Sequence, residues 1–299
     1  MTHEGVVMAI HPDRFRRVRH AVIAAVLLGT AGLSGCGSAA APAQPPPAQA
    51  APAPAPQAAP QGPKPTVVLV HGAFADASSW AGVVTRLQKQ GYTVTAPALP
   101  MRGLASDSAY LASLLGQIKG PVVLAAHSYG GAVISNAATN ADNVKALVYV
   151  NAFATENGEV LGNVEKGSTD SALNPALHQF TYPTGDGATA TELLVDPAKF
   201  PAVFGGDLPP EEAAELAATQ RPIAASAFSE PAGPPAWKTR PSWAVVATGD
   251  KAAGTDVTLS MAKRAKATIT ELPGSHLIMV SQPDAVTDVI VKAVGAVQP

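Results

Sequence analysis

Apolar residues recur in two alternating patterns from residue 66 onward. Short continuous apolar runs, typical of strands buried on both faces, predict strands at 66–70, 92–96, 122–126, 144–150, 243–247 and 267–272. Between these runs, apolar residues spaced by three and four positions predict amphipathic helices, the first from Trp80 to Leu87 with Ser79 as its N-cap. Others are expected at 111–118, 130–138 and from Pro283, where Ser281 and Asp284 would form a capping box. Strands alternating with helices favour an α/β fold: a mostly parallel sheet with helices on both faces.

The alternation stops between Ala154 and about Arg240. This stretch is rich in proline, glycine and alanine, and shows one helical pattern near 210–219. We interpret it as a cap insertion lying over the strand ends. The expected domain is therefore 66–299, with a cap at about 154–240.

The first 35 residues have the pattern of an export signal. Arginines precede an apolar run from Ala21 to Leu33, whose 13 residues are fewer than the roughly 20 that span a membrane. The run ends in Leu33-Ser34-Gly35-Cys36, which resembles a bacterial lipobox. The resemblance implies cleavage before Cys36, a diacylglyceryl group on its sulfur, and an acyl chain such as palmitate on the new amino terminus. Several such chains give stable bilayer anchoring. The alternative is an ordinary secretory signal with an incidental cysteine.

Residues 36–65 are expected to form a disordered tether behind the lipidated cysteine. Of the 27 residues from Ala39 to Pro65, 10 are proline and 11 alanine. Proline fixes φ and removes hydrogen-bond donors, so the stretch favours extended polyproline II, about 3.1 Å per residue. The expected location is the bacterial cell envelope. Gly37 stands where some bacteria place an aspartate for inner-membrane retention, which favours the outer membrane or cell surface.

Composition excludes several classes of function. The chain has 20 basic and 22 acidic residues, so no basic surplus favours nucleic acid as a partner. A single cysteine rules out an internal disulfide framework and a cysteine-based zinc site. Neither a metalloprotease motif, a dinucleotide fingerprint nor a P-loop is present, so we expect no metal and no cofactor.

Ser128 is the candidate nucleophile. It follows a predicted buried strand, precedes a predicted helix, and is flanked by small residues in Ala126-His127-Ser128-Tyr129-Gly130. This is the context of the G-x-S-x-G nucleophile elbow, in which a tight turn exposes the serine above the sheet. Ala126 replaces the first glycine and is small enough for that position.

A serine hydroxyl needs a base, and the base needs an acid to orient it. His276 follows the last predicted strand and is the candidate base. Asp250, after the strand at 243–247, is the candidate acid, with Asp256 and Glu156 as alternatives. The order Ser128, Asp250, His276 is that of α/β-hydrolases.

The loop His71-Gly72-Ala73-Phe74 follows the first predicted strand and is the candidate oxyanion loop. The backbone N–H groups of Ala73 and Tyr129 are the expected donors. Phe74 is a candidate for the substrate pocket wall, and His71 is expected to hold the loop in place.

Taken together, residues 66–299 resemble an α/β-hydrolase, on the motifs around His71, Ser128 and His276 and on Ala146-Leu147-Val148-Tyr149-Val150. The chain is most similar to the compact branch of small bacterial esterases, plant methylesterases and hydroxynitrile lyases. The resemblance implies a cofactor-free serine hydrolase. One departure is Lys251-Ala252-Ala253-Gly254, where the family often has an aliphatic residue and a proline after the acid.

The expected function is a membrane-anchored carboxylesterase that acts on small to medium ester substrates through an acyl-enzyme. Ser128 argues against haloalkane dehalogenases and epoxide hydrolases, which resemble this fold but place an aspartate at the elbow. Two alternatives remain: a lyase or perhydrolase that uses the same three residues, and a non-catalytic envelope-binding lipoprotein.

Overall fold

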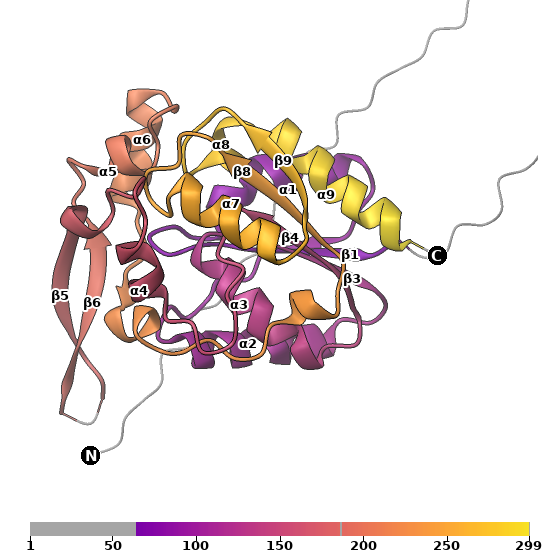
Figure 1. Cartoon of the computed structure of the whole chain (residues 1–299), viewed down its shortest axis with the longest axis horizontal. Helices are drawn as coiled ribbons and strands as arrows, with labels where there is room; N and C mark the ends of the chain where they lie inside the picture. The colour runs from indigo at the N-terminus through magenta and orange to yellow at the C-terminus, as the bar shows by residue number, and fades with distance from the viewer. Residues whose placement is uncertain (1–63, 186, 299) are drawn as a thin grey trace, which may run out of the picture. The chain divides into compact units, whose positions relative to one another are not determined.

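The computed structural model describes residues 64–185 and 187–298, and within them a six-stranded parallel sheet forms the centre of the molecule (Figure 1). The sheet has the order β2-β1-β3-β4-β8-β9, and every neighbouring pair in it is parallel. Its strands are β1 (Thr66–Val70), β2 (Val94–Thr95), β3 (Val122–His127), β4 (Val144–Val150), β8 (Ser242–Ala247) and β9 (Thr268–Leu272). The α/β fold expected from the sequence is confirmed.

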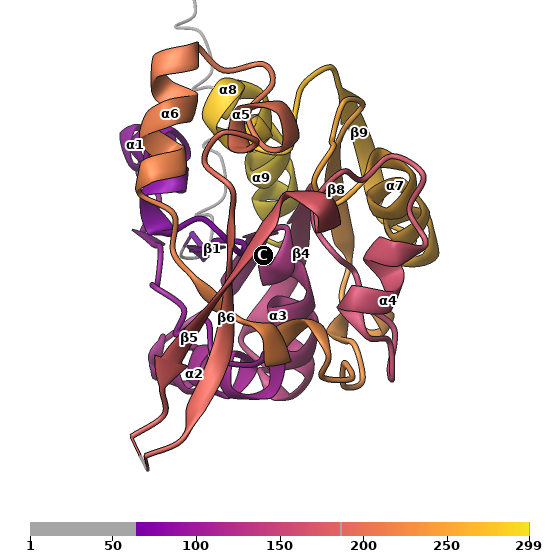
Figure 2. The same ribbon diagram turned by 90° about the vertical axis from the view of Figure 1, so that its left-hand side faces the viewer.

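Helices cover the sheet on two sides, which explains why its central strands are mostly apolar. All six residues of β3 are buried. Helices α1 (Ala81–Lys89) and α9 (Pro283–Val297) pack together on one side, and α2 (Leu104–Gln117) and α3 (Tyr129–Ala137) on the other (Figures 1 and 2). Helix α7 (Thr255–Arg264) packs on β8, and the short α8 (Ile278–Ser281) precedes α9.

The insertion between β4 and β8 has more structure than its composition predicts. It contains a three-stranded sheet, β5-β6-β7, with antiparallel pairing, formed by β5 (Leu177–Pro183), β6 (Thr189–Val195) and β7 (Ile223–Ala224). Its helices are α4 (Leu161–Lys166), α5 (Phe200–Val203) and α6 (Pro210–Ala218), of which the sequence predicted only α6. The hairpin of β5 and β6 lies to one side of the main sheet (Figure 1).

Three local expectations were wrong. Asp76, not Ser79, is the N-cap of a 3₁₀ turn at Ala77–Trp80 that leads into α1, and its side chain accepts a hydrogen bond from Ser78 N at 2.7 Å. No side chain caps α9, because Asp284 pairs with Arg86 of α1 instead. The strand expected at 92–96 is only two residues long, since β2 is an edge strand that pairs with β1 alone.

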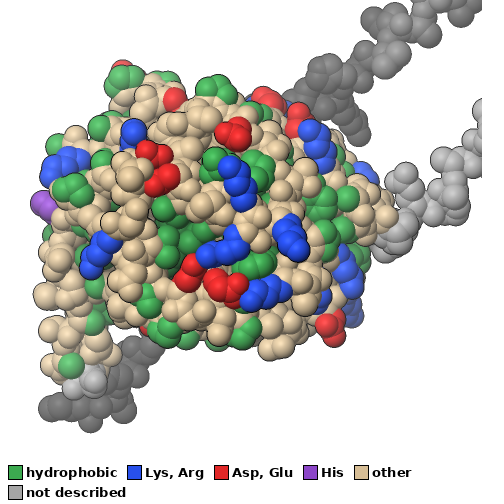
Figure 3. Space-filling view, viewed as in Figure 1, with side chains coloured by type: hydrophobic (Ala, Val, Ile, Leu, Met, Phe, Trp, Pro, Cys, Tyr) green, Lys and Arg blue, Asp and Glu red, His purple; other side chains and the backbone are tan. Residues whose placement is uncertain are grey.

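The expected signal sequence at 1–35, the lipidation site Cys36 and nearly all of the tether at 36–65 lie outside the described residues. Among the helices that the structure describes, none is both long and apolar enough to cross a membrane. Acidic and basic side chains are interspersed on the face shown in Figure 3.

Candidate active site

Ser128 occupies a strained turn between β3 and α3. Its backbone has φ 51° and ψ −125°, a region that residues other than glycine rarely adopt. The turn fits because two nearby residues are glycines: a Cβ on Gly72 would lie 2.7 Å from Ser128 Cβ, and one on Gly130 would lie 2.7 Å from His71 O. Among the small residues that identified the elbow in the sequence, Gly130 is thus required by close packing against the loop after β1.

His276 and Asp250 meet at the carboxyl ends of β9 and β8. His276 Nδ1 lies 2.9 Å from Asp250 Oδ2, and the two side chains are 1% and 0% exposed. A carboxylate acceptor at Nδ1 holds the imidazole proton there and leaves Nε2 as the basic nitrogen. Nε2 is buried and makes no hydrogen bond in this structure.

The other oxygen of Asp250 is held by its own loop. Oδ1 accepts hydrogen bonds from Ala252 N at 2.9 Å and from Ala253 N at 3.0 Å. A proline at either position would have no N–H to donate. The departure from the family pattern after Asp250 therefore gives the carboxylate two main-chain donors.

The two alternative acids face other partners. Asp256 accepts hydrogen bonds from Ser168 Oγ at 2.6 Å and Thr169 N at 2.8 Å, both in the insertion. Glu156 forms an ion pair with Lys238 at 2.6 Å. The structure thus brings Asp250 to His276 and gives the other two carboxylates separate structural contacts.

Asn151 and His127 hold the loop that carries His276, residues 273–277, which we call the histidine loop. The sequence analysis singled out neither residue for this role. Asn151 is fully buried at the end of β4; its Nδ2 donates to the carbonyl oxygens of Ser275 and His276, both at 3.0 Å. Its Oδ1 accepts from Ala247 N, at the end of β8. His127 Nε2 lies 3.1 Å from the same His276 oxygen. Burial, with the nearby His276, lowers the pKa of His127 well below its ordinary value, so its ring is neutral. In both cases the signal available in the sequence was a polar residue directly after a run of five apolar residues, 122–126 before His127 and 146–150 before Asn151.

The loop after β1 brings Ala73 beside the elbow, because Gly72 packs directly against Ser128. His71 fixes this loop: its Nδ1 lies 3.0 Å from Gly72 O, and its Nε2 accepts from Leu99 N at 3.0 Å. Tyr129 begins α3, where a backbone N–H has no partner within the helix. Its hydroxyl donates to Asp107 of α2 at 2.8 Å, which anchors the residue after the elbow.

Aromatic rings cover the site. Phe204 of the insertion packs edge-on against His276, with ring centroids 4.8 Å apart. Phe74 contacts Phe204 edge-on and lies parallel to Phe228, with centroids at 5.8 and 6.2 Å. Ser128 is only 6% exposed. The insertion therefore encloses the candidate site with apolar walls, and Phe74 forms part of one.

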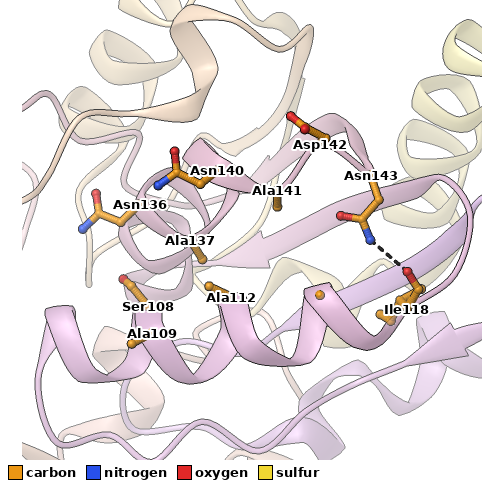
Figure 4. A pocket seen from close by; sticks show the side chains of 11 residues that line it. Ser108, Ala109, Ala112, Ile118, Asn136, Ala137, Asn140, Ala141, Asp142 and Asn143 are labelled. Atoms are coloured by element: carbon orange, nitrogen blue, oxygen red, sulfur yellow. Dashed lines mark hydrogen bonds between the residues drawn. The ribbon is translucent and has the colours of Figure 1, made fainter.

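A separate groove of about 470 Å³ lies between α2 and the segment that follows α3, lined by Ala112, Asn140 and Asn143 among others (Figure 4). None of Ser128, Asp250 and His276 lines it. In the described part of the chain, no three His, Cys, Asp or Glu side chains are arranged to hold a metal ion.

Glu165 of α4 is a buried carboxyl group near the site. Burial, together with the charge of Asp250, raises its pKa to about 8. Glu165 is therefore mainly protonated at neutral pH, which spares the site a second negative charge beside Asp250.

We expect the Glu165→Gln substitution to stabilise the protein increasingly as pH rises from about 5 to about 8. Over this range the unfolded chain releases the proton of Glu165 while the folded chain retains it, so wild-type stability falls with pH, and glutamine removes this loss. The advantage should grow by up to about 1.4 kcal/mol per pH unit. Urea unfolding of both proteins at several pH values measures it. Glu211→Gln, on exposed α6, controls for loss of a surface carboxyl; an advantage for Glu165→Gln that is independent of pH would contradict the prediction.

A parallel sheet with a serine at a strained turn after one strand, and a hydrogen-bonded histidine and aspartate after two others, is the architecture of α/β hydrolases. The chain belongs to the alpha/beta hydrolase family, whose model matches residues 67–289.

Similar proteins include esterases. The chain is 27% identical over 172 residues to a putative chloroplastic methylesterase 15 of Arabidopsis thaliana, covering 52% of this chain and 39% of that protein. It is 32% identical over 107 residues to a carbendazim-hydrolysing esterase of a Nocardioides species, covering 31% and 44%. The chain thus spans less than half the length of either curated relative.

Solved structures with the same fold include polyneuridine aldehyde esterase, with a TM-score of 0.65 and 19% identity over 77% of this chain and 99% of that one. The pyrethroid hydrolase PytH has a TM-score of 0.62 and 23% identity over 78% and 98%. At these identities the likeness shows the fold alone.

Proposed function

We propose that the chain is a serine hydrolase that cleaves carboxylic esters of small to medium size through an acyl-enzyme. The observation that supports it most directly is the buried His276–Asp250 hydrogen bond, with a basic nitrogen left free, on loops beside the strained turn of Ser128. The similarity to a methylesterase and to a carbendazim-hydrolysing esterase supports ester substrates.

In the first half of the reaction, Ser128 Oγ forms a bond to the ester carbonyl carbon while its proton moves to His276 Nε2. Backbone N–H groups of Ala73 and Tyr129 stabilise the negative charge on the carbonyl oxygen, and each such donor contributes about 3–4 kcal/mol. Asp250 stabilises the imidazolium. The ester C–O bond then breaks, and His276 returns the proton to the leaving alcohol.

In the second half, water attacks the acyl-enzyme while His276 accepts its proton. The bond from the acyl carbon to Ser128 Oγ breaks, the proton returns to the serine, and a carboxylic acid leaves. Water is the only co-substrate, and the two half-reactions balance without an oxidant or a reductant. The apolar walls formed by Phe74, Phe204 and Phe228 favour an uncharged acyl or alcohol group.

Labelling with a fluorophosphonate tests this proposal. We expect the protein isolated from a bacterial membrane fraction to hydrolyse short and medium acyl esters and to take up one phosphonyl group, which peptide mapping places on Ser128. An adduct at another serine would overturn the assignment of Ser128 as nucleophile. A folded protein with neither turnover nor adduct would overturn the proposal and favour a non-catalytic binding lipoprotein. Assays with cyanohydrins and with hydrogen peroxide would distinguish a lyase or perhydrolase.

We propose in addition that Cys36 is lipidated and anchors the enzyme in the bacterial envelope, with the proline-rich stretch as a spacer. The Leu33-Ser34-Gly35-Cys36 sequence after a short apolar run supports this. The intact mass of the same labelled sample, isolated from a bacterial membrane fraction, reports both cleavage before Cys36 and the added acyl chains. A mature chain that lacks these chains would overturn the anchor without affecting the esterase proposal.

A further inference from the structure

Two segments of the insertion bind the loops that carry His276 and Asp250. Phe204, after α5, accepts hydrogen bonds at its carbonyl oxygen from Ser275 Oγ at 2.9 Å and Leu277 N at 3.1 Å, on both sides of His276. Residues 168–172, after α4, bind the loop that follows Asp250. The insertion therefore contacts the supports of both residues as well as covering the site.

The contacts to the Asp250 loop have a specific geometry. Lys251 O accepts from Ala172 N at 2.7 Å, and Ala252 O accepts from Ser171 Oγ at 2.6 Å. Each carbonyl belongs to the same planar peptide group as an N–H that donates to Asp250 Oδ1, those of Ala252 and Ala253 respectively. The insertion thus holds the far end of both peptide groups that orient the carboxylate.

The direction of the Ser171 hydrogen bond is fixed by its surroundings. Leu173 N donates to Ser171 Oγ at 3.2 Å, so the single hydroxyl proton is directed to Ala252 O. The segment itself is attached to α7, since Ser168 Oγ donates to Asp256 Oδ1 at 2.6 Å and Asp256 N donates to Asp170 at 3.1 Å. Ser171 therefore lies on a segment that is anchored independently of its own hydroxyl.

We propose that Ser171 is a positioning residue for Asp250, acting through the peptide group between Ala252 and Ala253; this inference rests on the proposed ester hydrolysis. Ser171 touches no reacting atom. Its hydrogen bond orients the peptide and polarises its N–H toward Asp250. This chain has no proline directly after Asp250. The insertion instead helps to fix the conformation of the loop that follows Asp250. Removal of such an outer hydrogen bond shifts the carboxylate away from the geometry that orients His276.

The Ser171→Ala substitution tests this role. We expect kcat for a short ester to fall about tenfold, with KM within about twofold, because substrate binding does not involve Ser171. Ser171→Thr keeps a hydroxyl and should recover most of the loss. Ser229→Ala is the matched control, because Ser229 also lies in the insertion and donates to a carbonyl, that of Ser226 within its own turn. Thermal unfolding confirms that each variant is folded.

A double-substitution cycle with Asp250→Ala separates positioning from a general structural effect. If Ser171 acts through Asp250, Ser171→Ala should leave the rate of Ser128 phosphonylation unchanged once Asp250 is absent. Three results would each overturn the inference: a loss of phosphonylation rate from Ser171→Ala that persists in the Asp250→Ala background, an unchanged kcat in Ser171→Ala, or no recovery of kcat in Ser171→Thr. A wild-type protein that neither hydrolyses esters nor reacts with the phosphonate would instead overturn the proposed function.

Discussion

The Asp250→Asn substitution is expected to lower kcat for ester hydrolysis by about 10³- to 10⁴-fold, with little change in KM. The amide has the same shape as the carboxylate, and its oxygen still accepts the N–H groups of Ala252 and Ala253, so the fold is preserved. Its NH₂ group then faces His276 Nδ1, where the carboxylate oxygen accepts now. The imidazole must accept at Nδ1 and carry its proton on Nε2, so it cannot take the proton of Ser128.

Steady-state kinetics with a short acyl ester measure this loss, and thermal unfolding verifies that the variant is folded. Asp256→Asn is the matched control, because it removes a carboxylate close in sequence that contacts Ser168 and Thr169 rather than His276. If Asp256→Asn lost as much kcat as Asp250→Asn, or if Asp250→Asn stayed within tenfold of wild type, Asp250 would not be the acid.

The sequence predicted the central sheet well, because its strands follow a local pattern, and it indicated three candidate residues by their places after strands of that sheet. Parallel strands covered on both faces are mostly apolar: β3 is buried throughout, and Lys145 is the one exposed residue of β4. The elbow requires small residues beside Ser128, and the close approach of Gly72 and Gly130 shows why. A residue that must lie after a particular strand can be recognised from its place in the chain.

The strands inside the insertion and the supporting contacts could not be predicted in the same way. Strand β5 exposes most of its side chains, so it lacks the apolar pattern that identifies a strand. Ser171 and Ala252 are 81 residues apart in the chain, and neither has a local signal for its partner. Asn151 is separated from the histidine loop by 124 residues. Such pairs form only when the whole fold brings two loops together.

Asn151→Asp is expected to destabilise the protein by about 3–5 kcal/mol at pH 7 and to lower kcat as well. The Nδ2 group of Asn151 donates to two carbonyl oxygens, those of Ser275 and His276, in a fully buried site. A carboxylate there would place negative charge against two acceptor oxygens in a fully buried site, and an unpaired buried charge is costly. The histidine loop would move away from β4, and with it the ring that faces Asp250.

Urea unfolding at pH 7 and pH 5 measures the effect, together with kcat at both. Protonation of the new carboxyl restores one donor, so part of the lost stability should return as pH falls. Asn143→Asp is the matched control: Asn143 Nδ2 also donates to two carbonyls, of Leu115 and Ile118, but at a half-buried position by the groove of Figure 4. There water solvates the charge, and we expect a loss of about 1 kcal/mol with kcat unchanged. Equal losses in the two variants would show that burial of Asn151 beside the histidine loop has no special role.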